Sequence, residues 1–330
     1  MTAEGPEQAE RVWRPGFPVD VPAILGSLRR GPSDPCYRDG GDGTVWRATR
    51  TPDGPVLLRV RAEGTAGPVR ARAWGPGTGW ALDGLPELLG ARDDPAGFCP
   101  DPAHPVLVDA YRRFPGWRVP RTRAVFEALT AAALEQRVTG AQARTGWRAL
   151  LLRFGEPAPG PASDGDGPAA GMRVPPSPAQ WAAIPTWEWL SAGVEQARSR
   201  VVVGAAGRAG RLEALIDLPA AQAADRLRSV PGVGVWTAAE VGQRAHGDPD
   251  AFSWGDYHAA RDVSWALTGR VLDEPGCATE LERYRGHRYR VQRLLELAGV
   301  RRPRRGPRLA VPSHLPVRPP PGAGPRRRRW

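Results

Sequence analysis

The stretch SVPGVGVWTA, residues 229–238, joins two helical segments through a turn that a helix cannot contain. Pro231 lacks a backbone N–H, and Gly232 and Gly234 favour turn conformations, so the preceding helix ends before them. A second helix begins at Trp236. Because glycine has no side chain, the N–H groups of such a turn are uncovered and can face a phosphate. An ordinary tight turn between packed helices is the alternative, and the turn by itself favours it.

The composition indicates a globular protein with more than one domain. A chain of 330 residues is long for one domain, and 41% hydrophobic residues are enough for real cores. No apolar run approaches the roughly 18–20 residues that span a bilayer, and the N-terminus lacks the apolar region of a secretory signal. The three cysteines, Cys36, Cys99 and Cys277, have no C-x-x-C spacing, which excludes a disulfide framework and a four-cysteine cluster. We therefore expect a cytoplasmic protein.

Ten of the eleven net positive charges come from the C-terminal segment. Residues 301–330 hold ten arginines and no acidic residue, which leaves 36 of the 46 basic residues against 35 acidic ones in the body. This segment is rich in arginine and proline, cannot bury a core, and is predicted to be disordered. It is suited to phosphate contacts with nucleic acid, and equally to being a solvated terminus.

All basic residues are arginine, and the 330 residues contain no lysine. A GC-rich genome explains such a composition, but the chemical consequence is independent of its cause. Lysine Schiff bases, P-loop lysines and kinase lysines are excluded.

The hydrophobic pattern predicts an α+β protein with an antiparallel sheet followed by helices. Residues 44–61 alternate apolar and polar around a Pro-Asp-Gly turn, which predicts a β-hairpin, and residues 69–77 continue the alternation. From about residue 104 the period is helical. The predicted helices cover residues 123–138, 141–155, 195–215, 219–228, 236–246, 257–268 and 288–298.

The same pass along the chain predicts its organisation. We expect a sheet domain over 1–95, a helical region over 96–300 and the tail over 301–330. Residues 157–178 are rich in glycine and proline and are predicted to be a flexible loop. Ser177, with proline after it and Gln180 three residues on, predicts a capped helix start.

A second stretch, DPDAFSWGDYH (residues 248–258), follows the hairpin after about twenty residues. Its presence favours the phosphate-binding reading of the hairpin over an ordinary tight turn. Hairpin, spacing and a loop ending in aspartate resemble the HhH-GPD superfamily of DNA base-excision glycosylases. Matching segments upstream (FEALTAAALEQRVTGAQA, LLRFGEP) and downstream (RGHRYRVQRLLELAG) extend the resemblance over roughly residues 80–300. With the N-terminal sheet, the chain is most similar to the DNA-3-methyladenine glycosylase II branch, whose sheet domain is TBP-like. The matching positions are Leu227, Pro231, Gly232, Val233, Gly234, Thr237, Ala238, Gly255 and Asp256.

The resemblance implies a fold and an activity. It implies two helical subdomains that flank an active-site cleft, and a monomer that associates with the nucleoid when it binds damaged double-stranded DNA. The expected reaction is hydrolysis of the N-glycosidic bond of alkylated purines, of the 3-methyladenine and 7-methylguanine type, after base flipping. Relatives that also cut the backbone carry a lysine where this chain has Trp236, so we expect no lyase activity.

Asp256 is the predicted catalytic residue, because a carboxylate stabilises the oxocarbenium-like sugar and can orient the attacking water. Its structural alternative is an N-cap for the next helix, and both roles can hold together. The predicted base pocket comprises Trp236, Glu240, Trp254 and Tyr257. The π face of Trp236 suits a cationic purine, while core packing is its alternative. Glu240 departs from the branch, which can have an aromatic residue there, and either favours cationic bases or faces solvent.

The resemblance also implies DNA and ion contacts. Gln136 and Arg137 match the turn that fills the gap left by the flipped base, with Arg137 where the branch often has an apolar wedge. Pro231, Gly232, Val233, Gly234 and Thr237 match the DNA-binding hairpin. Backbone carbonyls of Arg228, Val230 and Val233 match the ligands of a structural Na⁺ or K⁺. No cofactor is expected to be required, and no iron–sulfur cluster is expected.

Other classes of function remain open at the sequence level. One is a non-catalytic helix–hairpin–helix DNA-binding protein in which Asp256 only caps a helix, which an assay for free base would distinguish. Another is a protein-interaction scaffold without DNA affinity, which a gel shift would distinguish. A glycosylase for a different damaged base is the enzymatic alternative.

Overall fold

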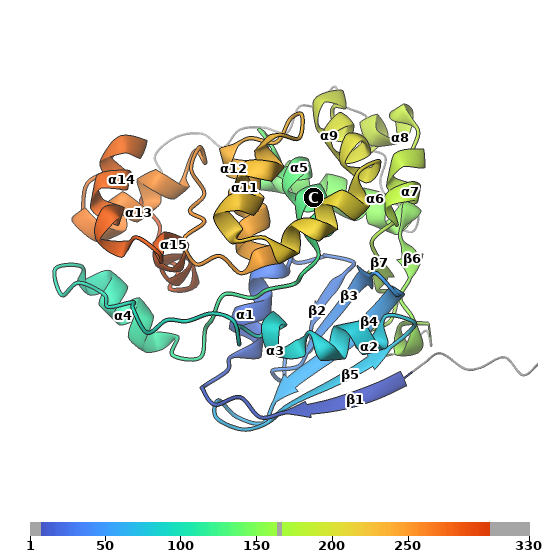
Figure 1. The fold of residues 1–330 in the computed structure, drawn as a ribbon, viewed down its shortest axis with the longest axis horizontal. Coiled ribbons are helices and arrows are strands. Elements are labelled where there is room, and N and C mark those ends of the chain that lie inside the picture. Colours follow the sequence, from blue (N-terminus) through green and yellow to red (C-terminus); the bar gives the residue numbers. More distant parts are fainter. Residues whose placement is uncertain (1–7, 164–166, 304–330) are drawn as a thin grey trace, which may run out of the picture.

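The computed structural model describes residues 8–163 and 167–303, and within them one five-stranded antiparallel sheet lies beneath two groups of helices (Figure 1). The strand order is β1-β5-β4-β3-β2. The predicted hairpin is confirmed, since β3 and β4 pair from Val45↔Val60 to Thr51↔Gly54. The strands are β1 (Gln8–Trp13), β2 (Tyr37–Asp39), β3 (Val45–Thr51), β4 (Gly54–Ala62) and β5 (Val69–Trp74).

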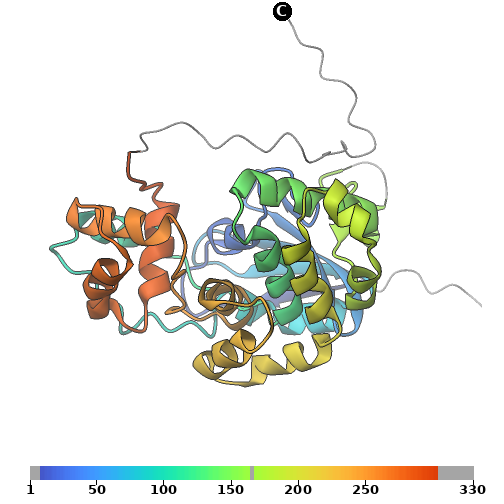
Figure 2. The same ribbon diagram turned by 90° about the horizontal axis from the view of Figure 1, so that it is seen from above.

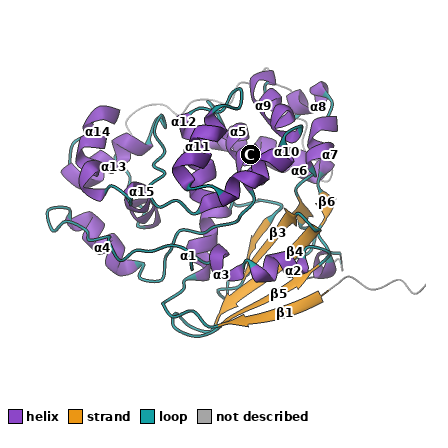
Figure 3. Cartoon of the chain, viewed as in Figure 1, coloured by secondary structure: helices purple, strands orange, loops and turns teal. Residues whose placement is uncertain are grey.

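Short helices pack around the sheet, and a central group of helices lies above it (Figure 3). The helices near the sheet are α1 (Val21–Leu25), η1 (Gly26–Leu28), α2 (Thr78–Asp83) and α3 (Leu85–Leu88), whereas α4 (Pro105–Arg113) packs against the C-terminal helices instead. The central group contains α5 (Val125–Glu135), α6 (Gly140–Phe154), α7 (Pro178–Ala183), α8 (Thr186–Ser191), α9 (Gln196–Ala206), α10 (Ala209–Glu213), η3 (Ala214–Asp217), α11 (Ala220–Arg228), α12 (Val235–Val241) and η4 (Gly242–His246), the last a π-helical turn.

A C-terminal group of helices completes the fold and lies beside the central group (Figure 2). It comprises α13 (Ala259–Thr268), α14 (Glu274–Leu281), η5 (Glu282–Tyr284) and α15 (Arg288–Leu297). The long helices are therefore confirmed to within a few residues, with one exception. Residues 195–215 do not form one helix, because Gly207 ends α9 and Arg208 leaves the helical conformation before α10.

The prediction of a flexible loop over 157–178 is wrong for much of that segment. β6 (Glu156–Pro157) pairs with β7 (Arg173–Val174), and η2 (Gly160–Ala162) lies between them. Small apolar residues of the segment pack onto the sheet with Trp46 and Trp74, whose rings stack 5.7 Å apart. Glycine and proline content predicted the turns but not this burial. The Ser177–Gln180 capping box before α7 is confirmed.

Alternate residues of the strands face two different cores. Val45, Leu58 and Val60 pack into a core that extends to α13 and α15, whereas Trp46 and Leu57 face the segment over 157–174. A further core holds the central helices together. The domain boundaries at 95 and 300 stay predictions, and the tail prediction falls mainly on 304–330, outside the described residues. Nowhere in 8–163 or 167–303 does a helix have the length and apolarity needed to span a membrane.

Candidate active site

The hairpin between α11 and α12 requires glycine at one position and leaves another open. Gly232 has φ +83°, and a Cβ built there would lie 2.5 Å from Val201 Cγ2 of α9. Val233 packs into the central core, whereas Pro231 and Gly234 are exposed. Gly234 is the N-cap of α12 and makes no side-chain cap, and a Cβ there would meet nothing within 4 Å. The first N–H groups of α12 are therefore not covered by a cap.

The turn after α5 is tied to the hairpin. The Gln136 amide nitrogen donates to the Gly232 carbonyl oxygen at 2.9 Å and to Thr237 Oγ1 at 2.8 Å. Thr237 is predicted to contact DNA, but it is only 2% exposed, so its hydroxyl supports Gln136 from inside the protein. Arg137, the next residue along the turn, is exposed and has φ +54°, a left-handed conformation that is uncommon for residues other than glycine. The turn thus presents Arg137 beside the hairpin.

Asp256 binds the backbone just before α13 and keeps one carboxylate oxygen available. Its Oδ1 accepts from the backbone N–H groups of His258 at 2.7 Å and Ala259 at 2.8 Å. It therefore binds the backbone at the start of α13, but the helix begins at Ala259 and its N-cap residue is His258, so Asp256 is not the N-cap itself. Its Oδ2 accepts no hydrogen bond from any residue that the structure describes, and the residue is half-buried. Gly255 has φ +84°, and a Cβ there would lie 3.8 Å from Trp236 Cβ. The fold therefore brings the loop that carries Asp256 against the first turn of α12.

The predicted pocket residues divide into surface and buried groups. Trp236 is half-buried, and Tyr257 is 69% exposed, with the Arg261 guanidinium 4.7 Å from its ring centroid. Trp254 is partly buried against Phe252, with ring centroids 4.3 Å apart.

Glu240 does not face solvent, so that alternative is wrong. It is 7% exposed, with Oε1 accepting from Ser253 Oγ at 2.9 Å and Oε2 paired with Arg244 Nη1 at 2.7 Å. Its carboxylate is engaged inside the protein, one helical turn after Trp236.

Two groups of functional interest escaped the sequence reasoning. Ser253 is bonded by side chains of three helical elements, α12, η4 and α15, and its partners lie 13, 10 and 39 residues away, so this role has no sequence signature. Arg302, near the end of the described chain, lies against α13. Its Nε donates to Asp262 Oδ1 at 2.8 Å, and its Nη2 lies 3.3 Å from His258 Nδ1.

Known proteins resemble this chain in both sequence and structure. No family model matches it. Proteins of two strains of Mycobacterium tuberculosis, described as "Probable bifunctional transcriptional activator/DNA repair enzyme AlkA", are 33% identical over 177 residues, which is 52% of this chain and 32% of theirs. The chain thus spans about a third of the length of the curated relatives it matches.

Solved structures match over most of the chain. A 3-methyladenine DNA glycosylase from Archaeoglobus fulgidus superposes with TM-score 0.68 at 17% identity, covering 88% of this chain and 98% of its own. MBOgg1 gives 0.63 at 16% identity (88% and 97%), and a Clostridium acetobutylicum 8-oxoguanine glycosylase/lyase gives 0.62 at 11% (91% and 99%). The chain has the fold of the helix–hairpin–helix DNA glycosylases. The predicted resemblance and the α+β fold class are confirmed.

The monovalent cation stays a prediction, and the hydrogen bonding of the three carbonyl groups predicted to hold it leaves that prediction open. The carbonyl oxygens of Arg228 and Val233 accept no hydrogen bond from residues of the described ranges, and that of Val230 accepts one, from the Val233 N–H at 3.0 Å. Each carbonyl oxygen has two lone pairs, so all three retain capacity for an ion. Among the described residues, no cluster of three or more His, Cys, Asp or Glu side chains is arranged to bind a metal.

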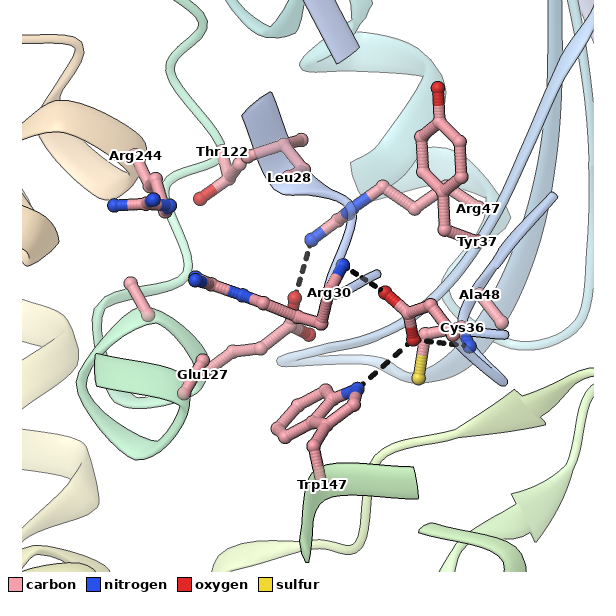
Figure 4. Close-up of a pocket in the computed structure, with 13 residues that line it drawn as sticks. Leu28, Arg30, Cys36, Tyr37, Arg47, Ala48, Thr122, Glu127, Trp147 and Arg244 are labelled. Carbon is pink, nitrogen blue, oxygen red and sulfur yellow. Dashed lines mark hydrogen bonds and ion pairs between the residues drawn. The ribbon is translucent and has the colours of Figure 1, made fainter. Parts of the chain in front are cut away.

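A separate cavity of the glycosylase fold lies between the sheet and α5 and α6, and it contains none of the predicted site residues (Figure 4). Arg47 pairs with Glu127 at 2.5 Å, and Arg30 pairs with Glu135 at 2.8 Å. Asp34 accepts from Trp147 Nε1 at 3.0 Å. These pairs join the sheet side to the central helices. The cavity is lined by Leu28, Arg30, Asp34, Cys36, Tyr37, Arg47, Ala48, Thr122, Glu127, Ala128, Ala131, Trp147 and Arg244.

Proposed function

We propose that the protein is a monofunctional DNA glycosylase that hydrolyses the N-glycosidic bond of alkylated purines in double-stranded DNA, as a step of base excision repair. The observation that carries the proposal is Asp256, whose Oδ2 is left without a partner among the described residues while its loop lies against Trp236. The glycosylase fold and the AlkA-like relatives support the same reading.

In this proposal the hairpin binds the DNA backbone. The uncapped N–H groups at the start of α12 face a phosphate. The carbonyls of Arg228, Val230 and Val233 would hold a Na⁺ or K⁺, which would supply positive charge near that phosphate. Gln136 fixes the turn after α5 relative to the hairpin, so that the exposed Arg137 enters the space left by the flipped nucleotide. An arginine can stack there through its guanidinium plane.

Asp256 acts on the sugar of the flipped nucleotide. The bond between C1′ and the purine nitrogen breaks, and its electron pair leaves with the base. Alkylation gives the purine a positive charge, so it departs as a neutral molecule. The Asp256 carboxylate stabilises the positive charge that develops on the sugar. Water then bonds to C1′, and Asp256 takes its proton.

Trp236, the residue before the Thr-Ala pair of α12, is the reason for proposing a monofunctional glycosylase and not a glycosylase/lyase. A lyase needs an amine to form a Schiff base, and the sequence has Trp236 there and no lysine elsewhere. Trp236 instead offers a π face to a cationic base. The expected products are free base and an intact abasic strand.

Release of free base from DNA containing 7-methylguanine or 3-methyladenine tests the proposal. We expect Asp256→Asn to slow single-turnover release by about 100-fold or more, because the charge opposite the developing cation is lost. Asparagine keeps an oxygen that can accept from the His258 and Ala259 N–H groups, so folding and affinity for abasic-site DNA should change little. Asp262→Asn, which changes a carboxylate one turn along α13, is the matched control.

The same assay distinguishes the alternatives. Since two structural neighbours are named for 8-oxoguanine, the panel includes that base, and its release in place of alkylated purines would replace the substrate assignment. DNA binding without release of any base would favour a non-catalytic binding protein. Sedimentation of the free protein and of its DNA complex tests the expected monomer.

A further inference from the structure

The loop that carries Asp256 is held at one buried residue, Ser253. The Asp256 N–H donates to the Ser253 carbonyl oxygen at 3.1 Å, so the two residues close a turn. Ser253 is 2% exposed. The position of Ser253 therefore fixes the position of the Asp256 backbone N–H.

Side chains from α12, η4 and α15 saturate the Ser253 hydroxyl. Ser253 Oγ donates to Glu240 Oε1 at 2.9 Å and accepts from Gln243 Nε2 at 2.9 Å and from Gln292 Nε2 at 3.1 Å. A hydroxyl has one donor and two acceptor positions, and all three are used. The Ser253 N–H also donates to Gln292 Oε1 at 3.2 Å.

The partners of Ser253 are themselves fixed. Arg244 Nη1 binds the second oxygen of Glu240 at 2.7 Å, and Gln243 Nε2 also donates to the Ala251 carbonyl oxygen at 2.7 Å. Glu240, Gln243 and Gln292 are 7%, 2% and 6% exposed. Because buried polar groups are costly to leave unpaired, these bonds keep one arrangement of the loop.

We propose that Ser253 is a positioning residue for Asp256, and that it sets the carboxylate relative to the hairpin helix. The connection runs from Trp236 along one turn of α12 to Glu240, from Glu240 to Ser253, and from Ser253 to Asp256. α15 holds the opposite side through Gln292. This inference rests on the proposed function, and it accounts for Glu240 by its bond to the loop rather than by contact with the base.

Single-turnover base release by Ser253→Ala tests the inference. We expect release at saturating DNA to slow by about 10- to 100-fold, because small misplacement of a reacting group has effects of this size. The Kd for abasic-site DNA should stay within about threefold. The matched control is Ser264→Ala. Ser264 lies on α13 and is also buried, and its hydroxyl accepts the Leu272 N–H at 3.0 Å.

Two further measurements separate positioning from loss of stability. In an Asp256→Asn background, Ser253→Ala should slow release no further, because Ser253 acts through Asp256. Gln292→Ala, which removes the α15 side chain that binds Ser253, should slow release in the wild-type background. The inference would be overturned if Ser253→Ala and Ser264→Ala released base at equal rates. It would also be overturned if Ser253→Ala slowed base release as much in the Asp256→Asn background as in the wild type. Either result would leave the proposed function standing.

Amide exchange tests the positioning without any activity. The N–H groups of His258 and Ala259 are bonded to Asp256 Oδ1, so they should exchange faster in Ser253→Ala than in Ser264→Ala. If the wild type releases no base from any probe, the proposed function fails, and exchange still decides the structural role. Unchanged exchange at both amides would contradict that role.

Discussion

At the scale of single residues, His246 is a half-buried histidine whose surroundings disfavour the protonated imidazole. Its Nε2 lies 3.0 Å from the Leu215 carbonyl oxygen, and its Nδ1 has no hydrogen-bond partner in the described part of the chain. Burial lowers the pKa of His246, and the Leu215 carbonyl only partly opposes this effect. The folded state therefore binds fewer protons at this site than the unfolded state between the two pKa values.

This direction predicts how stability depends on pH. The contribution of His246 to the free energy of unfolding is fully present above its unfolded pKa near 6.5, and it is lost as pH falls toward the lower folded pKa. We expect the wild type to lose stability relative to His246→Gln between pH 7 and pH 5, measured by urea denaturation at each pH. Burial raises the pKa of nearby Asp248, which acts in the opposite direction, but Asp248 is common to both proteins. A constant difference across this range would contradict the prediction.

Residue roles could be predicted from the sequence where a local motif carries them. Asp256 belongs to a loop at a recognisable distance from the hairpin, and its bonds to backbone N–H groups follow from its place just before a helix, although that helix begins at Ala259 and not at Tyr257. Ser253 could not be predicted, because its partners come from η4, α12 and α15 and meet only in the folded chain. Glu240 was open between two roles for the same reason: the sequence does not show that Arg244 and Ser253 occupy both of its oxygens.

At the scale of elements, the two hairpin glycines should respond differently to alanine. Gly232→Ala places a Cβ 2.5 Å from Val201 at φ +83°, so we expect the free energy of unfolding to fall by about 1–3 kcal/mol. Gly234→Ala meets nothing within 4 Å and has φ −94°, so stability should stay near that of the wild type. If the start of α12 faces a phosphate as proposed, the added methyl group would cover part of that surface and weaken binding to abasic-site DNA.

Thermal denaturation and DNA titration of the two variants check this pair. The Gly232→Ala variant should lower Tm, and the Gly234→Ala variant should raise Kd at unchanged Tm. Unchanged DNA affinity in Gly234→Ala would show that the N–H groups at the start of α12 do not face the backbone.

Long periodic elements could be predicted because their pattern is local. α5, α6 and the β3–β4 hairpin follow from periodicity and turn residues. β2 is only three residues long, and the short strands β6 and β7 lie in a segment dominated by glycine and proline. What fixes these pieces is packing on the sheet, which does not depend on their own sequence pattern.

At the scale of the whole molecule, sheet and C-terminal helices share a core. Val60 of β4 and Val263 of α13 belong to the same cluster of buried side chains. Within that core Arg290 of α15 binds both carboxylate oxygens of Asp93, and the two side chains are 2% and 1% exposed. Asp93 also accepts the Val119 N–H at 2.9 Å. The chain before the central helices is thereby joined to the chain after them.

Removing Arg290 should consequently destabilise the whole molecule. Arg290→Met leaves the Asp93 carboxylate buried without its countercharge, and we expect a loss of about 3–5 kcal/mol in the free energy of unfolding. Asp93→Asn with Arg290→Met should lose less than the sum of the single variants, because no buried charge then remains. Urea denaturation followed by far-UV circular dichroism and by tryptophan fluorescence measures both effects.

Since the Arg290–Asp93 pair lies in the shared core, the two probes should report one transition at one midpoint. Two separate transitions, with only one displaced in Arg290→Met, would mean that residues 1–95 fold as an independent domain despite the shared core.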